Sequence, residues 1–276
     1  MSFSPEIKIS WDGMTHPSFH RKNNEDAFLT LALNSEEFYY LGKTGSAQVG
    51  ENDFIFAVAD GMGGEKSGEY ASRIAVDKIT QIIPKYFRKK NKDEDACFEE
   101  AFRQVFEDTN KALLYLGSSY PECSNMGSTL SLIWITPDQV RFAHMGDSRI
   151  YKQLPGNPIE QITHDHTHVG YLLRTGAINE REARMHPRRN ALQRALGAGQ
   201  QIVNPQMGCF HLEKGYRYIL CSDGLVDGLW DKHITRLINQ YEIDNEEGES
   251  IAELLVHEAV GGLSKDNTTA LIIDIS

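Results

Sequence analysis

Apolar residues along this chain follow two different periods, and the two periods come in blocks. Short runs that are apolar throughout, or that alternate with polar residues, are typical of β-strands. Such runs predict strands over residues 7–11, 27–33, 54–59, 128–135, 140–145, 149–154, 216–222 and 268–275. The segment Thr136-Pro137-Asp138-Gln139 has proline at the second position of a turn, so the strands on either side of it are predicted to form a hairpin.

Other segments repeat apolar residues every three or four positions, which is the spacing of an amphipathic helix. They predict helices over residues 68–83, 96–116, 234–241 and 251–259. Pro84 is expected to end the first of these helices, and Gly261-Gly262 the last. The helix over 96–116 has one continuous apolar stripe, which indicates a surface that packs against the core rather than a ligand site.

Two polar segments interrupt these patterns. Residues 34–52 are predicted to be a loop or an irregular hairpin, and residues 166–186 to contain short helices. Because strands and helices come in blocks, the pattern favours an α+β domain in which antiparallel sheets are covered by helices. Without a repeat, a low-complexity tract or a linker, residues 1–276 are expected to form a single domain.

Composition narrows the classes of partner. The net charge of −11 argues against nucleic acid, whose phosphates require lysine and arginine, but it does not exclude a phosphorylated protein. Cys97, Cys123, Cys209 and Cys221 show no C-x-x-C spacing, so reduced thiols and a cytoplasmic location are expected. The first residues do not have the pattern of a signal peptide, and no apolar run is long enough to span a membrane, so no membrane partner is expected.

The stretch VADGMGGEKSGEYAS, which starts at Val58, has the strand, glycine-rich turn and helix of a phosphate-binding loop. A Walker A motif requires glycine directly before the lysine, but Glu65 precedes Lys66 and would repel a nucleotide phosphate. The third glycine of a dinucleotide fingerprint is also missing. What remains is Asp60 at the end of an apolar strand, which suits a cation, although a simple Asp-Gly turn is the structural alternative.

Further acidic residues occupy similar positions. Asp223 follows the strand over 216–222, Asp266 directly precedes the last strand region, and Glu25-Asp26 lead into the strand over 27–33. If these strand ends meet, their carboxylates repel one another unless a cation lies between them. Hard oxygen ligands suit Mg²⁺ or Mn²⁺, and two such ions can activate a bridging water. The sequence therefore predicts a centre for two divalent ions.

At this point the sequence resembles a known family, the metal-dependent type 2C serine/threonine protein phosphatases. The resemblance runs from Arg21 to Ile273 and is closest to the bacterial members. It rests on motifs that occur in the family's order: RKNNEDA, VADGMGG, GEYAS, MGSTL, AHMGDSRIY, ITHDHT, HPRRNALQRALG, LCSDGL and DNTTALI. It implies a four-layer α-β-β-α sandwich of two antiparallel sheets flanked by helices, with two Mn²⁺ or Mg²⁺ ions at one edge.

The resemblance also implies roles for individual residues. Asp60 matches the ligand that bridges the ions, and the carbonyl of Gly61 matches a ligand of one of them. Asp223 and Asp266 match ligands of the other ion, and Glu25 and Asp26 match residues that support the centre. Arg21 matches the guanidinium that holds the substrate phosphate, which suits its bidentate geometry. On this interpretation Arg21, Asp60 and Asp223 are the catalytic residues.

A third, weaker ion is implied in some members, and Asp147 and Asp227 match one version of its site. In another version an aspartate precedes the Met-Gly-Ser/Thr-Thr motif, where this chain has Asn125. Met62 stands where animal members have a histidine proposed as the general acid, so the acid is unassigned here. The segment 34–52 is longer than in compact bacterial members, and its role is not predicted.

Simpler interpretations stay open for several residues. Arg21 alone could be a solvated surface residue, and Asp147 could only cap a turn between two strands. His164, His166 and His168 alternate, as in a zinc site on one strand face, but their neighbours Asp165 and Thr167 match a family element in a mobile segment over the site.

The functional prediction is a phosphatase that hydrolyses phosphoserine and phosphothreonine, by attack of a water that bridges the two ions. Expected partners are phosphorylated proteins and a cognate Ser/Thr kinase or its substrates, and the protein is expected to be a monomer. The competing hypothesis is a phosphoprotein-binding module on the same fold that does not catalyse a reaction.

Overall fold

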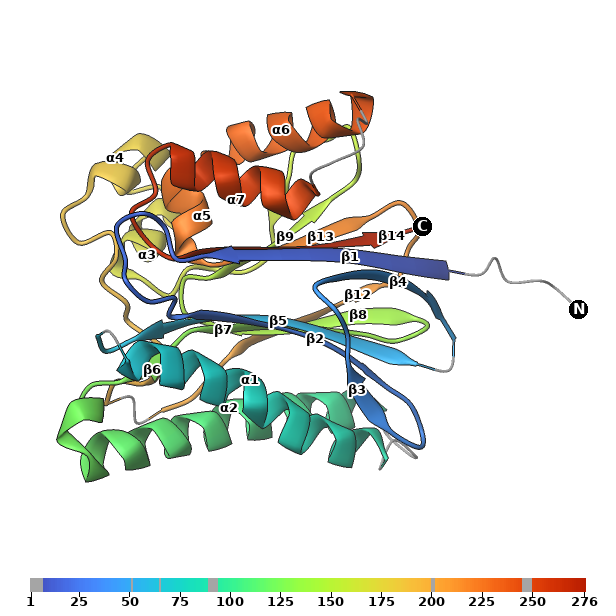
Figure 1. The fold of residues 1–276 in the computed structure, drawn as a ribbon, viewed down its shortest axis with the longest axis horizontal. Coiled ribbons are helices and arrows are strands. Elements are labelled where there is room, and N and C mark those ends of the chain that lie inside the picture. The colour runs from blue at the N-terminus through green and yellow to red at the C-terminus, as the bar shows by residue number, and fades with distance from the viewer. Residues whose placement is uncertain (1–6, 51, 65, 89–93, 200–201, 245–249) are drawn as a thin grey trace, which may run out of the picture.

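A computed structural model describes residues 7–50, 52–64, 66–88, 94–199, 202–244 and 250–276. The first residues of the chain and Glu65, which entered the arguments about a signal peptide and a Walker motif, lie outside the described residues. The chain forms two antiparallel sheets packed face to face, with helices on both outer faces (Figure 1). This four-layer α-β-β-α arrangement is the predicted α+β fold.

The first sheet has the strand order β10-β9-β13-β14-β1-β4. Its strands are β1 (Ile7–His16), β4 (Thr44–Val49), β9 (Arg149–Gln153), β10 (Glu160–Gln161), β13 (Arg217–Cys221) and β14 (Thr268–Ile275). Helices α6 and α7 cover its outer face, with the short α5 beside them (Figure 1). These helices are α5 (Asp223–Gly228), α6 (Asp231–Asp244) and α7 (Ile251–Gly261).

The second sheet has the order β11-β6-β5-β7-β8-β12, and β2 joins it by pairing with β5. Its strands are β2 (Asp26–Leu33), β3 (Phe38–Tyr40), β5 (Asp53–Met62), β6 (Gly127–Ser128), β7 (Leu130–Ile135), β8 (Gln139–Met145), β11 (Leu196–Gly197) and β12 (Gln206–His211). Its outer face packs against α1 (Ser67–Phe87) and α2 (Glu94–Ser119), which is followed by the short 3₁₀ helix η1 (Pro121–Cys123). Two more short helices, α3 (His168–Arg174) and α4 (Glu180–Met185), lie at one end of the sandwich.

Strand β5 shows why the central strands are apolar throughout. Phe54, Phe56 and Val58 pack between the two sheets, whereas Ile55 and Ala57 pack against helices α1 and α2. Both faces of the strand are buried, so successive side chains enter different parts of the core. Strand β5 is therefore rigid up to the point where Asp60 begins the polar site.

The structure corrects three of the predicted elements. Helix α1 continues through Pro84 to Phe87, because the buried Ile82 and Ile83 keep its last turn on the sheet. The segment 34–52 contains β3, which pairs with β2, and β4, which pairs with β1 of the other sheet, so it connects the two sheets rather than forming one hairpin. The strand predicted over 128–135 is divided at Thr129 into β6 and β7.

Strand β12 and helix α5 were not predicted. Strand β12 is an edge strand of mixed polarity whose position is set by its pairing with β8. Helix α5 has only 6 residues and closely follows the apolar strand β13. None of the helices in the described part of the chain is both long and apolar enough to cross a membrane.

Candidate metal centre

A cavity of about 600 Å³ opens near the end of the sandwich where β2, β5, β14 and helix α5 come together. It will be called the metal cavity. Its wall contains most of the predicted site residues: Arg21, Glu25, Asp60, Gly61, Asp147, Asp223 and Asp266. Asp227 lies in an adjoining cavity of about 310 Å³, whose wall also includes Asp147 and Asp223. The fold therefore brings together acidic residues that are far apart in the sequence.

Asp26 lies next to this cavity and links the two sheets. It pairs with Asp60 in the register of β2 and β5. Its carboxylate Oδ2 accepts hydrogen bonds from the hydroxyls of Ser222 (2.7 Å) and Thr269 (2.6 Å), both at the other sheet. Its Oδ1 is buried without a hydrogen-bond partner among the described residues. One oxygen of Asp26 thus holds the two sheets together through hydrogen bonds, and the other could still bind a cation or a proton.

The backbone of Asp60 is held in place by Thr129, at the break between β6 and β7. The Asp60 N–H donates to Thr129 Oγ1 (2.9 Å), and the Thr129 N–H donates to the Asp60 carbonyl (2.8 Å). Thr129 Oγ1 also contacts Ser148 Oγ at 2.6 Å, which ties this pair to the turn that carries Asp147. These contacts bring the VADG, MGSTL and GDSR motifs together in the fold.

Glycine is required where these loops approach one another. A Cβ at Gly61 would overlap the backbone oxygen of Gly68, and a Cβ at Gly68 would lie 2.6 Å from the carboxyl carbon of Glu25. A Cβ at Gly224 would likewise overlap the backbone oxygen of Asn267. The absence of side chains at these positions lets the segments that carry Asp60, Glu25, Asp223 and Asp266 pack in direct contact.

The side chain of Asn267 connects the loops around Asp266. Its amide donates to the carbonyls of Pro17 (3.0 Å) and Asn23 (2.9 Å), and its oxygen accepts from the Glu25 N–H (2.8 Å). Asp266 Oδ2 accepts a hydrogen bond from Arg21 Nη2 at 2.6 Å. Arg21 is 47% exposed at the rim of the metal cavity, so it is placed where it can meet an incoming anion.

The carboxylates perturb one another strongly. Burial, followed by repulsion from Asp26, Asp223 and Asp147, raises the pKa of Asp60 well above its usual value. Burial and then Asp147 and Asp266 do the same to the pKa of Asp223. Burial raises the pKa of Asp147 to about 7, with Asp165 as the next cause. Such a group of buried carboxylates is favourable only with protons or cations among them.

The donor set fits hard divalent cations. It consists of carboxylates and a carbonyl, the ligand types that Mg²⁺ and Mn²⁺ prefer. Asp223 Oδ1, like Asp26 Oδ1, is buried without a hydrogen-bond partner in the described part of the chain. Among the described residues no three such side chains already converge as a closed ligand set. The carboxylates line the cavity without closing around one point.

Two residues singled out as departures have different environments. Met62 lines the metal cavity, where its thioether cannot donate a proton. Asn125 is exposed in the turn before β6, has a φ of 65°, and does not line the metal cavity or the adjoining cavity with Asp227. Asparagine adopts this left-handed conformation readily, so Asn125 serves the turn. The version of a third ion site that uses this position is not supported.

The alternating histidines do not form a zinc site on one strand face. The His166 ring stacks on the buried His144 with centroids 4.9 Å apart, and His166 Nδ1 accepts a hydrogen bond from the Gly146 N–H (3.1 Å). His168 instead begins helix α3 and faces His186. The three side chains therefore have separate surroundings, because the segment turns at Thr167.

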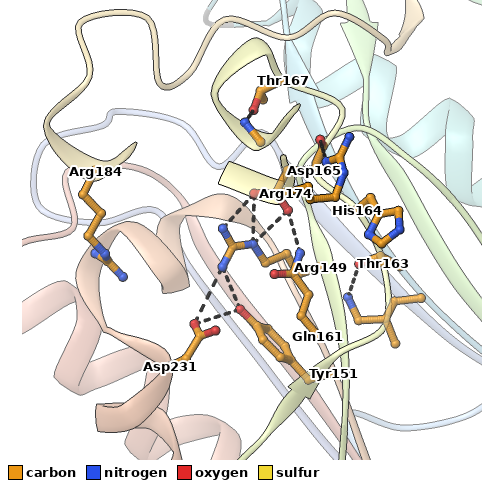
Figure 2. Close-up of polar contacts among 12 residues, drawn as sticks. Arg149, Tyr151, Gln161, Thr163, His164, Asp165, Thr167, Arg174, Arg184 and Asp231 are labelled. Carbon is orange, nitrogen blue, oxygen red and sulfur yellow. Dashed lines mark hydrogen bonds and ion pairs between the residues drawn. The ribbon is translucent and has the colours of Figure 1, made fainter. Parts of the chain in front are cut away.

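Sequence reasoning missed an ion-pair network beside the site, shown in Figure 2. Arg149, from the GDSR motif, donates three hydrogen bonds to the carboxylate of Asp165, at 2.7 to 3.2 Å. It also donates to Tyr151 Oη (2.8 Å) and lies 3.7 Å from Asp231. This network fixes Asp165, the residue directly before the segment 166–187, to β9 and α6. The segment 166–187 is here called the flap. The sequence shows the GDSRIY and HDHT motifs, but it does not show that Arg149 of the first contacts Asp165 of the second.

The flap has a second attachment at its other helix. Arg184 of α4 donates to the carbonyls of Asp227 (3.3 Å) and Leu229 (2.6 Å), at the end of helix α5. Its guanidinium also lies 4.1 Å from the ring centroid of Trp230. Helix α5 begins at Asp223, so the flap is fastened to the element that carries a predicted ligand.

The comparison with known proteins agrees with this geometry. A sequence profile of the family described as protein phosphatase 2C matches residues 43–256. The chain belongs to this family. It is 32% identical over 225 residues to the serine/threonine phosphatase Stp of Listeria welshimeri, covering 81% of this chain and 85% of that protein. It is 33% identical over 221 residues to PstP of Mycobacterium tuberculosis, covering 80% of this chain and 40% of that longer protein.

Solved structures of the family show the same fold. The phosphatase Stp1 of Staphylococcus aureus superposes with a TM-score of 0.76 at 30% identity, over 96% of this chain and 94% of that chain. The PstP phosphatase of Mycobacterium tuberculosis gives a TM-score of 0.74 at 29% identity, over 97% and 98%. The catalytic domain of PstP in complex with two manganese ions superposes with a TM-score of 0.71 at 27% identity, over 98% of this chain and 99% of that one.

Proposed function

We propose that this protein is a metal-dependent protein phosphatase that hydrolyses phosphoserine and phosphothreonine. Three named relatives are serine/threonine phosphatases, and the catalytic domain of PstP has been solved with two manganese ions. The observation that carries the proposal is the metal cavity, where a buried carboxylate oxygen of Asp223 has no hydrogen-bond partner among the described residues and lies amid further carboxylates. Its substrates are phosphorylated proteins.

Asp60, the Gly61 carbonyl, Asp223 and Asp266 would hold two Mn²⁺ or Mg²⁺ ions, with Asp60 between them. When bound, the ions supply positive charge and a reactive water for attack on phosphorus. Glu25 and Asp26 support these ligands, and Asp147 and Asp227 are the candidates for a third ion. Arg21, at the rim, binds the phosphate oxygens by its fork of N–H donors and orients the phosphorus toward the ligands.

The remaining groups constrain the chemistry of the leaving group. Met62 cannot donate a proton, so the proton for the serine or threonine alkoxide must come from another group or from solvent in the metal cavity. No cysteine lines this cavity, so the proposed reaction does not use a covalent cysteinyl-phosphate. A single domain over residues 1–276, a monomeric state, a cognate kinase and a cytoplasmic location remain proposals that follow from the sequence.

The test is release of phosphate from a phosphothreonine peptide, with Mn²⁺ present or removed by EDTA. We expect turnover with Mn²⁺, loss in EDTA, and loss in Asp223→Asn. Asp138→Asn, an exposed aspartate in the turn between β7 and β8, is the matched control and keeps full activity. Peptide binding without hydrolysis under all these conditions would favour the non-catalytic binding module instead.

A further inference from the structure

A further cavity, of about 330 Å³, lies at the base of the flap and shares no lining residue with the metal cavity. It will be called the flap-base cavity. The segment that follows the flap separates the two. Asn190 and Leu192 line the metal cavity, whereas Gln193 and Arg194 line the flap-base cavity. A bridge between Thr167 and Leu192 joins this segment to the start of α3.

The flap-base cavity gathers positive charge in a chain whose net charge is −11. Arg174 and Arg194 both line it, and neither forms an ion pair with a carboxylate among the described residues. Arg174 Nη1 donates a hydrogen bond to the backbone carbonyl of Asp165, at 3.0 Å. Burial is the largest cause that lowers the pKa of His166 to about 3, and His144 and then these two arginines act in the same direction.

The one carboxylate in the wall does not offset this charge. Asp165 is already bound by three hydrogen bonds from Arg149 and one from Gln161 (2.8 Å). Figure 2 shows Arg174 and His164 near Asp165, away from Asp231. Arg149 therefore compensates the charge of Asp165, and the described part of the chain supplies no counter-ion to the two arginines of the cavity.

Several neutral groups of the wall can donate hydrogen bonds. Tyr171, Asn204 and the ring of His164 line the cavity, and their side chains have no acceptor among the described residues. His166 Nδ1 accepts the Gly146 N–H, so Nε2 carries the ring proton. It too has no acceptor in the described part of the chain. Two cations with several unused donors around one cavity are complementary to an oxyanion with several acceptor oxygens.

We propose that the flap-base cavity binds a phosphoryl oxyanion, separately from the metal cavity. Guanidinium groups bind phosphoryl oxygens through paired, charge-assisted hydrogen bonds, which neutral donors then extend. Two sources share this chemistry: free inorganic phosphate, and a second phosphoryl group on a multiply phosphorylated protein substrate. The site lies close to the metal cavity, because His166 exchanges two backbone-directed hydrogen bonds with Gly146, the residue before Asp147.

The first arm of the test is calorimetric titration of the Mn²⁺-loaded protein with inorganic phosphate. The wild type is expected to need two sites, one at the metals and one at the flap base. Arg194→Ala and Arg174→Gln should each weaken one site about tenfold, since a hydrogen bond to a charged group contributes about 1.5 kcal/mol or more. Gln keeps a donor for the Asp165 carbonyl. Arg181→Ala, an exposed arginine of α4 outside the cavity, is the control and should keep both sites.

The second arm identifies the source. It compares kcat/KM for peptides with one and with two phosphoryl groups, in Arg194→Ala and in Arg181→Ala. A preference for the doubly phosphorylated peptide that falls only in Arg194→Ala assigns the site to the substrate. An unchanged preference, with weakened phosphate binding, assigns it to free phosphate. The first arm needs no turnover, so an inactive protein would refute the proposed phosphatase activity without deciding this site. Isotherms of both pocket variants identical to wild type would overturn the proposal.

Discussion

At the scale of the residue, the site is defined by carboxylates that the fold keeps close together at an energetic cost. Asp60 and Asp223 are buried among further acids, and each has its pKa raised by burial and by its neighbours. Removing one of these charges should therefore lower catalytic activity but raise the stability of the metal-free protein. Functional sites often retain such locally unfavourable arrangements.

Asp60→Asn tests this opposition directly. We expect it to lower kcat/KM for a phosphothreonine peptide by more than about a hundredfold, since even groups that only support metal ligands contribute up to that amount. In EDTA the variant should melt at a higher temperature than wild type, because a buried negative charge is gone from among Asp26, Asp147 and Asp223. Thermal unfolding with EDTA and with Mn²⁺ measures both effects. A lower melting temperature in EDTA would show that other interactions of Asp60 outweigh its repulsion from the neighbouring carboxylates.

His144 provides a pH-dependent contribution to stability. Burial is the largest cause that lowers its pKa to about 4, from an ordinary value of 6.5. The unfolded chain binds a proton there before the folded chain does, so stability is full above pH 6.5 and falls as the pH drops toward 4. Between pH 7 and pH 5 this contribution amounts to about 2 kcal/mol.

In His144→Gln, the unfolding free energy should therefore fall less between pH 7 and pH 5 than in wild type. This holds whatever the substitution does to stability at pH 7. The measurement is urea unfolding at several pH values. His211→Gln, at an exposed position of β12, is the control and should retain the wild-type slope. A slope in His144→Gln equal to that of wild type would mean that other groups produce the acid sensitivity.

At the scale of the element, the site depends on where strands and short helices end. Asp26 and Asp60 lie opposite each other because β2 and β5 pair in that register, and a slip by one residue would turn one of them to the other face. Helix α5 presents Asp223 at its first residue and is fastened to the flap at its last turn through Arg184. The flap is thus attached to the helix that carries a proposed ligand. Loosening the flap should therefore reduce activity on large substrates more than on small ones.

Arg184→Met should loosen this attachment, because it keeps an unbranched apolar stem but removes the guanidinium that donates hydrogen bonds to Asp227 and Leu229. We expect kcat/KM for a phosphoprotein to fall about fivefold, the effect of about 1 kcal/mol, with a smaller change for a small aryl phosphate. Arg181→Met, on the same helix but exposed, is the matched control. Equal losses on both substrates would argue that the flap does not select proteins.

At the scale of the whole molecule, the proposed ligands belong to both sheets. Asp60 comes from the second sheet, whereas Asp223 and Asp266 flank strands of the first, and Asp26 joins the two through Ser222 and Thr269. An ion held between them would connect the two halves of the sandwich. Binding of ions to the folded state alone should therefore stabilise the entire domain.

We expect Mn²⁺ to raise the melting temperature of the whole protein in one cooperative transition. At a free concentration one hundred times the dissociation constant, each site contributes about 2.7 kcal/mol, or several degrees for a domain of this size. Calorimetry with Mn²⁺ and with EDTA measures the shift, and Asp223→Asn should reduce it. If only local probes near the flap respond while the main transition stays fixed, the ions do not bridge the two sheets.

The sequence by itself determined the elements with strong periods and the chemistry of the ligands. The apolar alternation of β5, the stripe of α2 and the acids at strand ends are local properties, because side-chain period follows from backbone geometry. Motif order then predicted the sandwich and the family. These features do not require knowledge of which segments meet.

Only the tertiary structure decided which groups share a cavity. It left Asn125 outside the metal cavity, carried α1 beyond Pro84, and formed the edge strand β12. It also made Arg174 and Arg194 line the same cavity. Each outcome depends on contacts between remote segments, such as burial of Ile82 and Ile83 against the sheet or pairing of β12 with β8. Local propensity contributes too little free energy to override such contacts, so the sequence pattern alone could not predict them.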